Sequence, residues 1–158
     1  MRLILEPLTG SGVPSICMLN TLALNMLRGV CLTDKGVVMI KRSHELKKDV
    51  HKDFRGGKGE AFFYHYMDEQ SSNGAGRLFC KVVLPPGSSI GVHKHVGDHE
   101  VYLILSGKGR LNDNGVLVEV GPGDVNHCLD GQEHGLENIG DADLIYVANI
   151  LYTEQKKG

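Results

Sequence analysis

Short segments in which apolar and polar residues alternate follow one another along most of the chain. Alternation with a period of two is typical of β-strands, because successive side chains of a strand point to opposite faces. The pattern predicts strands over residues 61–67, 77–84, 89–95, 100–106, 108–111, 116–120, 124–128, 134–138 and 144–151. Turn-forming sequences such as Pro85-Pro86-Gly87 and Gly121-Pro122-Gly123 separate them. Short, evenly spaced strands with such turns indicate an all-β sandwich or barrel.

The chain before residue 61 has a less regular pattern. Residues 15–32 could form a helix, although both of its sides would be apolar. We therefore expect residues 1–38 to be a short helical or irregular extension that packs against the barrel or a partner subunit. Residues 39–158 are expected to form a single barrel domain, and Met39 could be the natural start. The segment from Ser43 is expected to be a short helical or extended arm.

The segment from Arg55 to Gly59 is rich in glycine and basic residues. Such a composition can bind anions, but the spacing is not that of a phosphate-binding P-loop. An ordinary flexible loop is therefore the favoured interpretation. Residues 71–76 are also expected to form a loop, from their Ser, Asn and Gly content.

Composition indicates one soluble globular domain. The chain has 158 residues, of which 41% are hydrophobic and 23% are charged. The net charge of −2 provides no basic field for nucleic acid, and we expect no nucleic-acid partner. No apolar run is long enough to span a bilayer, and the start lacks the features of a signal peptide. A cytoplasmic protein without a membrane partner is expected.

The four cysteines show neither a C-x-x-C spacing nor the density of a disulfide scaffold. They are Cys17, Cys31, Cys80 and Cys128. Buried free thiols are the simplest interpretation.

Histidine and acidic residues at short spacings carry the candidate chemistry. His93 and His95 lie two apart on a predicted strand, so their imidazoles project to the same side. Glu100 follows a short polar stretch, residues 96–99, that can turn the chain, and His134 comes on a later strand. A barrel lets strands that are far apart in sequence face a common interior. We therefore predict a metal site made of three imidazoles and one carboxylate.

The ligand types narrow the choice of metal. A nitrogen and oxygen set without a thiolate suits one divalent ion, Mn, Fe, Ni or Zn, and favours six-coordination. Two coordination positions would then stay open, as in reactive metal sites, whereas structural zinc sites are closed. Imidazoles must be neutral to bind a metal, so occupancy should fall below about pH 6.

The spacing of these residues resembles the two sequence motifs of the cupin superfamily, in a small single-domain form. The first motif is matched by Gly87, His93, His95, Glu100 and Gly107, and the second by Gly123, Gly131, His134 and Asn138. Leu129 stands where the family pattern usually has proline. The resemblance covers residues 76–151. It implies an antiparallel β-barrel or jelly roll with a metal held inside by the same three histidines and Glu100.

Alternation also predicts the surroundings of the site. Inward side chains are expected for Tyr102, Ile104, Leu136 and Asn138. Tyr102 is the candidate catalytic residue, because a phenol beside a cation could orient a ligand or pass a proton, although a core tyrosine is the favoured alternative. His99 is expected at the surface. His127 could line the mouth of the barrel, but a structural role is favoured.

Two classes of function fit these features, because cupins include dioxygenases, decarboxylases, isomerases, lyases and binding modules. The favoured one is a metal-dependent enzyme acting on a small oxygen-rich metabolite such as a carboxylate, hydroxy-ketone or sugar. The alternative is a non-catalytic module that binds a small molecule or sugar.

A homodimer is expected from the number of aromatic and apolar residues on the first two strands of the barrel. These residues are Phe62, Phe63, Tyr64, Tyr66, Phe79 and Val83. They exceed what a small barrel needs inside, although they could instead cover a second layer of the barrel itself.

Overall fold

The computed structural model describes residues 30–33 and 36–154. The chain divides into two compact units, residues 1–41 and 42–158. In the first unit, β1 (Val30–Thr33) and β2 (Gly36–Met39) form an antiparallel hairpin. Most of the helix expected over residues 15–32 lies outside the described residues, and its expected end belongs to β1.

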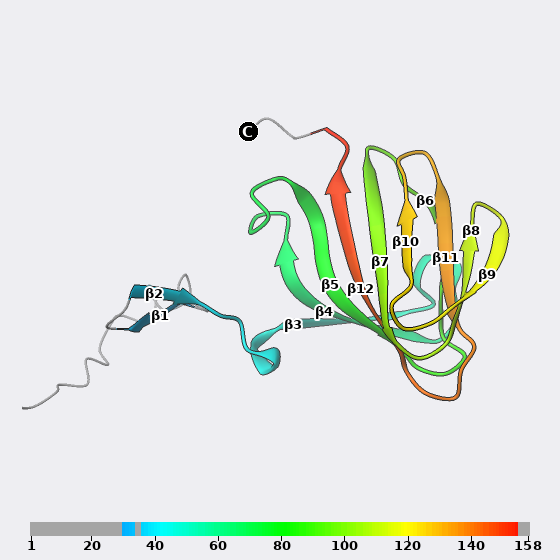
Figure 1. The fold of residues 1–158 in the computed structure, drawn as a ribbon, viewed down its shortest axis with the longest axis horizontal. Helices are drawn as coiled ribbons and strands as arrows, with labels where there is room; N and C mark the ends of the chain where they lie inside the picture. The colour runs from blue at the N-terminus through cyan, green and yellow to red at the C-terminus, as the bar shows by residue number, and fades with distance from the viewer. Residues whose placement is uncertain (1–29, 34–35, 155–158) are drawn as a thin grey trace, which may run out of the picture. The chain divides into compact units, whose positions relative to one another are not determined.

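The second unit consists of two antiparallel sheets. The larger has the strand order β10 (Val125–Cys128), β7 (Asp98–Ser106), β12 (Leu144–Tyr152), β5 (Gly76–Leu84), β4 (Glu60–Asp68) and β3 (Lys47–Lys52). The smaller has the order β6 (Ser89–Lys94), β11 (Glu133–Asn138), β8 (Gly109–Asp113) and β9 (Val116–Val120). Figure 1 shows β4, β5, β12, β7 and β10 side by side. The expected all-β, antiparallel architecture is confirmed.

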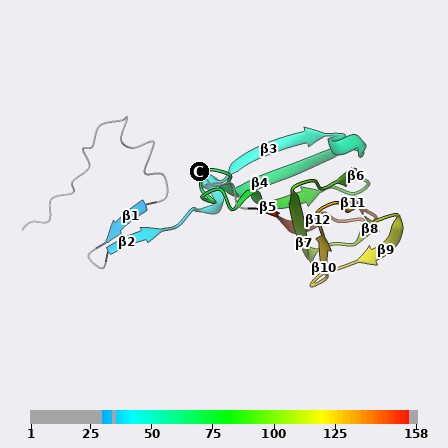
Figure 2. The ribbon, with the colours of Figure 1, turned by 90° about the horizontal axis from the view of Figure 1, so that it is seen from above.

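The segments before β3 and β4 contain two 3-10 turns, η1 (Ser43–Glu45) and η2 (Phe54–Gly56). Strands β3 and β4 form a hairpin, and the η2 turn that ends it lies against β6 (Figure 2). No helix in the described part of the chain is long and apolar enough to cross a membrane.

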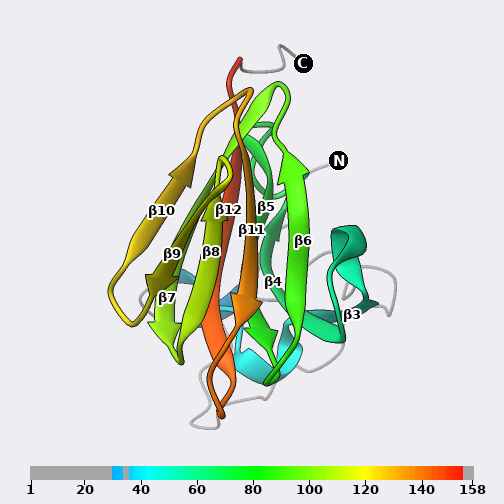
Figure 3. The same cartoon turned by 90° about the vertical axis from the view of Figure 1, so that its right-hand side faces the viewer.

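The core lies between the two sheets, which Figure 3 shows as layers with β8, β11 and β6 in front. Inward-facing residues of both sheets form one cluster of Ala61, Phe63, Cys80, Val82, Leu84, Ile90, Tyr102, Ile104, Leu111, Leu136, Leu144, Tyr146 and Ala148. The predicted inward positions of Tyr102, Ile104, Leu136 and Asn138 are confirmed, because all four are buried. The amide of Asn138 is satisfied inside the protein, since it donates to the carbonyl oxygens of Leu84 and Ala142 at 2.8 Å each.

Two cysteines belong to the described side chains, and both are buried free thiols, as expected. Burial raises the pKa of Cys80 to about 12 and that of Cys128 to about 11. Both groups are therefore protonated and unreactive at neutral pH. The side chains of Cys17 and Cys31 lie outside the described residues.

Candidate metal centre

Four side chains meet between the two sheets. His93 lies on β6, His95 directly follows that strand, and His134 lies on β11, whereas Glu100 comes from β7 of the other sheet. His134 and His93 are register partners, so their imidazoles lie side by side. One nitrogen or oxygen atom of each residue lies within 4.8 Å of those of the other three. The structure therefore brings together the four residues that the sequence pattern selects.

The distances within the cluster fit coordination of one ion. Glu100 Oε2 lies 2.9 Å from His134 Nε2, 3.2 Å from His95 Nε2 and 3.7 Å from His93 Nε2. The Nε2 atoms of His95 and His134 are 3.2 Å apart. Two ligands that are each about 2.1 Å from a metal and at right angles are about 3 Å apart. The four donors therefore need only small shifts to surround a metal ion.

The second nitrogen of each imidazole points away from the cluster toward an oxygen atom. The partners are Gly91 O for His93 (3.0 Å), Asp98 Oδ1 for His95 (2.6 Å) and Asn126 Oδ1 for His134 (2.7 Å). Because these oxygens accept hydrogen bonds, each ring carries its proton on Nδ1 and turns the lone pair of Nε2 inward. Three lone pairs and a carboxylate that face one another repel unless a cation lies between them. The donor set therefore fits a divalent metal ion.

Asp98 connects the cluster to the protein around it. Its carboxylate is buried, accepts from His95 through one oxygen and accepts from Arg77 Nε at 2.7 Å through the other. Burial alone would raise the pKa of Asp98, but the hydrogen bonds from Arg77 and His95 outweigh burial and lower it. Asp98 is therefore an anion that fixes the orientation of the His95 ring.

Asp98 and Asn126 are the functional residues that the sequence pattern did not identify. Residues 96–99 were expected to form a polar turn, whereas β7 begins at Asp98. Asn126 lies on β10, the strand at the edge of the larger sheet. The sequence did contain a signal for Asp98, which is a carboxylate three residues after His95. Metal-binding histidines usually donate their second N–H to such a group.

The charges of the cluster suit metal binding. Burial would raise the pKa of Glu100, but the nitrogens of His134, His93 and His95 around it outweigh burial and lower that pKa, so the group is a carboxylate. Burial lowers the pKa of His134, which keeps this imidazole neutral. Burial would also lower the pKa of His95, but the carboxylates of Glu100 and Asp98 outweigh burial and raise this pKa.

Tyr102 lies directly beside the cluster. Its ring stacks on that of His134, with centroids 4.5 Å apart and planes at 17°, and it also contacts Tyr146 at 4.6 Å. Burial, and then the negative charge of Glu100, raise the pKa of Tyr102 well above the ordinary value. Its phenol is therefore neutral and can act as a hydrogen-bond donor, but not as a phenolate.

A cavity of about 130 Å³ opens next to His93 and Glu100. Its wall has an aromatic part made of Phe54, Phe63, Tyr102 and Tyr146, and a basic part made of His51, Arg55, His65 and Arg77. Pockets for drug-sized ligands have about 300–1,000 Å³, so this cavity suits a much smaller molecule.

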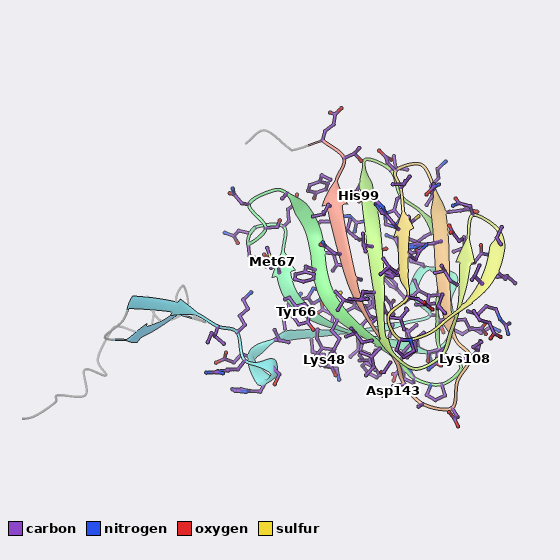
Figure 4. All side chains as sticks on the ribbon, viewed as in Figure 1. Lys48, Tyr66, Met67, His99, Lys108 and Asp143 are labelled. Carbon is purple, nitrogen blue, oxygen red and sulfur yellow. The ribbon has the colours of Figure 1, made fainter. Side chains whose placement is uncertain are left out.

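The two remaining histidines of interest lie away from this cavity. His99 Nδ1 is 2.7 Å from His127 Nε2, and the two rings pair across the adjacent strands β7 and β10. His99 is labelled on β7 in Figure 4. His127 is exposed and does not belong to the cavity wall.

Comparison with known proteins gives the family. The family model of the cupin domain matches residues 80–149. A Thermotoga maritima protein named oxalate-binding protein is 41% identical over 117 residues, which are 74% of this chain and 97% of that protein. The crystal structure of a predicted oxalate decarboxylase from the same organism superposes with a TM-score of 0.70 at 41% identity, over 72% of this chain and 99% of that one.

A more distant structure shows the fold alone. The polyketide cyclase RemF from Streptomyces resistomycificus matches with a TM-score of 0.56 and 23% identity, over 75% of this chain and 89% of its own. The matched family model, the relative at 41% identity and the two-sheet fold agree. The chain belongs to the cupin superfamily.

Proposed function

We propose that this cupin holds one divalent metal ion with His93, His95, Glu100 and His134, and that it binds a small dicarboxylate of the oxalate class beside this ion. The observation that carries the proposal is the orientation of the three imidazoles, each with its Nδ1 bonded outward and its Nε2 turned toward Glu100. A bound divalent ion would supply Lewis-acid positions for carboxylate oxygens, because four protein ligands leave part of a six-coordinate shell open.

The cavity supports a small anionic ligand. Its volume of about 130 Å³ admits only a few non-hydrogen atoms beside the metal ligands. Among the described residues of its wall, Glu100 is the single acidic one, whereas Arg55, Arg77 and three histidines also line it. Asp98 neutralises Arg77, so Arg55 supplies the uncompensated positive charge. A wall with this balance of charge favours an anion over a neutral sugar. A relative named for oxalate binding, 41% identical over 117 residues, supports the same class of ligand.

Turnover of the ligand is the second candidate, and the proton-carrying side chains of the cavity favour it. His51 and His65 line the wall and could each move a proton. Tyr102 is buried and neutral, so we assign to it the donation of a hydrogen bond that orients the ligand. Within the described part of the chain, the cavity wall has no carboxyl group besides Glu100. We therefore rank binding of the ligand first and its conversion second.

The test combines metal analysis with ligand titration. Protein purified without a nickel resin should contain nearly one equivalent of metal, which His95→Ala and Glu100→Ala should lose and Asp141→Asn, an exposed loop variant, should keep. Calorimetric titration with oxalate should give heat for metal-loaded protein and none after treatment with a chelator. Metal-free parent protein, or equal oxalate binding after chelation, would contradict the proposal. Release of formate or carbon dioxide would establish turnover.

We also propose that two copies associate through the outer face of the larger sheet. The strand register places Val125, Leu103, Val147, Lys81, Tyr64 and Lys48 in one row across this face. The residues of this row are apolar on β10, β7 and β12. On β5, β4 and β3, lysine ammonium groups lie over aromatic rings, and Lys81 Nζ is 4.4 Å from the centroid of the Tyr64 ring. Lys48 and Tyr66 are labelled on this part of the sheet in Figure 4. Phe63, by contrast, points into the core.

A further inference from the structure

The turn between β3 and β4 holds a basic residue in an unusual backbone conformation. Arg55, in the middle of η2, has φ 57° and ψ 27°, which is the left-handed region that residues with a Cβ atom avoid. Asp53 before it also has a positive φ, of 48°. A left-handed residue other than glycine costs conformational free energy, and such residues are concentrated at sites where function requires a fixed geometry.

Close backbone packing fixes this turn against β6, the strand that carries His93. A Cβ atom on Gly91 would clash with the carbonyl oxygen of Arg55, and a Cβ atom on Gly57 would clash with that of Ser89. Ser89 N also donates to Lys58 O at 2.8 Å, and Lys58 N donates to Ser89 Oγ at 2.9 Å. The segment that the sequence indicated to be a flexible loop is therefore bonded to the strand beside the candidate metal centre.

The side chain of Arg55 is directed by aromatic contacts. Its guanidinium carbon lies 5.6 Å from the centroid of the Phe54 ring. That ring packs in turn against His51, at 4.7 Å, and against Phe63, at 5.3 Å. Arg55 and these three rings all line the cavity that contains His93 and Glu100. Because Arg55 is exposed while Glu100 is buried, the guanidinium stands at the open end of the cavity.

The two arginines of the cavity differ in their partners. Arg77 donates to Asp98 at 2.7 Å, so its charge is neutralised within the protein. Arg55 forms no ion pair with any carboxylate of the described residues. A guanidinium presents a planar fork of N–H donors that matches a carboxylate, and it stays charged at every physiological pH. Arg55 is thus the cationic group of the cavity whose hydrogen-bonding capacity is available to a ligand.

We propose that Arg55 is the carboxylate-binding residue of this cavity, and that it receives the carboxylate of the ligand that lies farther from the metal ligands. The inference rests on the proposed binding of a small dicarboxylate. It assigns a task to each end of the ligand, since one carboxylate meets the metal and the other meets the guanidinium. Arg55 then selects dicarboxylates over monocarboxylates, because a monocarboxylate can satisfy only one end.

The test compares two variants that each remove one positive charge from the same turn. Arg55→Gln removes the guanidinium from the cavity, whereas the side chain of Lys58 does not line it, so Lys58→Gln is the matched control. Metal-loaded proteins are titrated with oxalate and with acetate. Arg55→Gln should weaken oxalate binding about 10- to 100-fold, the usual worth of a charge-assisted hydrogen bond, and should leave acetate binding nearly unchanged. Lys58→Gln should bind both probes like the parent.

A second variant separates binding from folding. Arg55→Gly removes the guanidinium and also relieves the left-handed conformation, so the thermal midpoint should stay the same or rise while oxalate binding falls as in Arg55→Gln. Parent-like oxalate binding by Arg55→Gln would overturn the assignment of Arg55 and leave metal-dependent binding intact. Equal losses for oxalate and acetate, or an equal effect of Lys58→Gln, would also overturn it. Metal-loaded parent protein that binds no oxalate would overturn both proposals.

Discussion

At the scale of single residues, oxygen atoms around the candidate metal centre hold the imidazoles in place. Asp98 Oδ1 accepts from His95 Nδ1 at 2.6 Å, and Asn126 Oδ1 accepts from His134 Nδ1 at 2.7 Å. Without these acceptors, a ring could turn or carry its proton on Nε2, and either change removes a ligand. The two side chains would therefore contribute to the affinity for the proposed metal ion without touching it.

This role predicts the behaviour of Asp98→Asn. The amide keeps one acceptor oxygen, but its NH₂ group cannot accept from Arg77, and it carries no charge to hold the His95 proton on Nδ1. We expect metal affinity to fall about 10- to 100-fold, as is common when a hydrogen-bond partner of a metal-binding histidine is altered. Competition with a chelator of known affinity measures the change. The exposed loop variant Asp141→Asn is the control, and parent-like affinity in Asp98→Asn would contradict the assigned role.

The sequence allowed the four cluster residues to be predicted but not the residues that support them. His93, His95 and Glu100 lie close together in the chain, and their spacing on strands determines where they point. Asn126 reaches His134 because β10 pairs with β7 at the edge of the larger sheet. No local sequence pattern specifies this pairing of the two strands. Arg55 was expected in a flexible loop, whereas it lies in the 3-10 turn η2, and its place beside the cavity results from contacts with the distant strand β6.

At the scale of elements, all strands with alternating patterns were predicted to within two residues, whereas β3 was predicted only as part of an arm. Its sequence Lys47-Lys48-Asp49-Val50-His51-Lys52 is polar on both faces. This composition is possible because β3 is an edge strand, and charged residues are common on edges, where they prevent pairing with other chains. Strand β9 is also largely exposed, but its sequence Val116-Leu117-Val118-Glu119-Val120 is apolar enough to be recognised. A strand made mainly of charged residues, such as β3, is therefore the kind that an apolar pattern misses.

The packing of the β3–β4 turn on β6 gives a prediction at this scale. In Gly91→Ala, the new Cβ atom would meet the carbonyl oxygen of Arg55 and the amide nitrogen of Gly57, so the turn must move away from β6. We expect a loss of about 1–3 kcal/mol in the free energy of unfolding, because crowding in a packed site usually costs this much. Urea denaturation measures the loss.

Gly121→Ala is the matched control for this change. A Cβ atom at Gly121 would meet no atom within 4 Å, so the stability of Gly121→Ala should stay close to that of the parent. Equal stability of the two variants would show that the turn can leave β6 without cost, and it would remove the support that β6 gives to Arg55.

At the scale of the whole molecule, the proposed dimer would associate through the outer face of the larger sheet. Leu103 is 37% exposed on the apolar part of this face, with Val125 and Val147 beside it on the neighbouring strands. A charge at this position in a dimer interface would be buried without a partner, which costs several kcal/mol and separates the subunits. In a monomer the same charge would stay in water and change little.

We therefore expect the parent to be a dimer and Leu103→Glu to be a monomer in sedimentation equilibrium. Leu117→Glu is the control, because Leu117 is 63% exposed on β9 of the smaller sheet, and this variant should remain dimeric. The metal content of both variants should match the parent, since the four cluster residues lie between the sheets and face away from either outer surface. A monomeric parent at high concentration, or a Leu103→Glu dimer, would contradict association through this face and leave the metal centre unaffected.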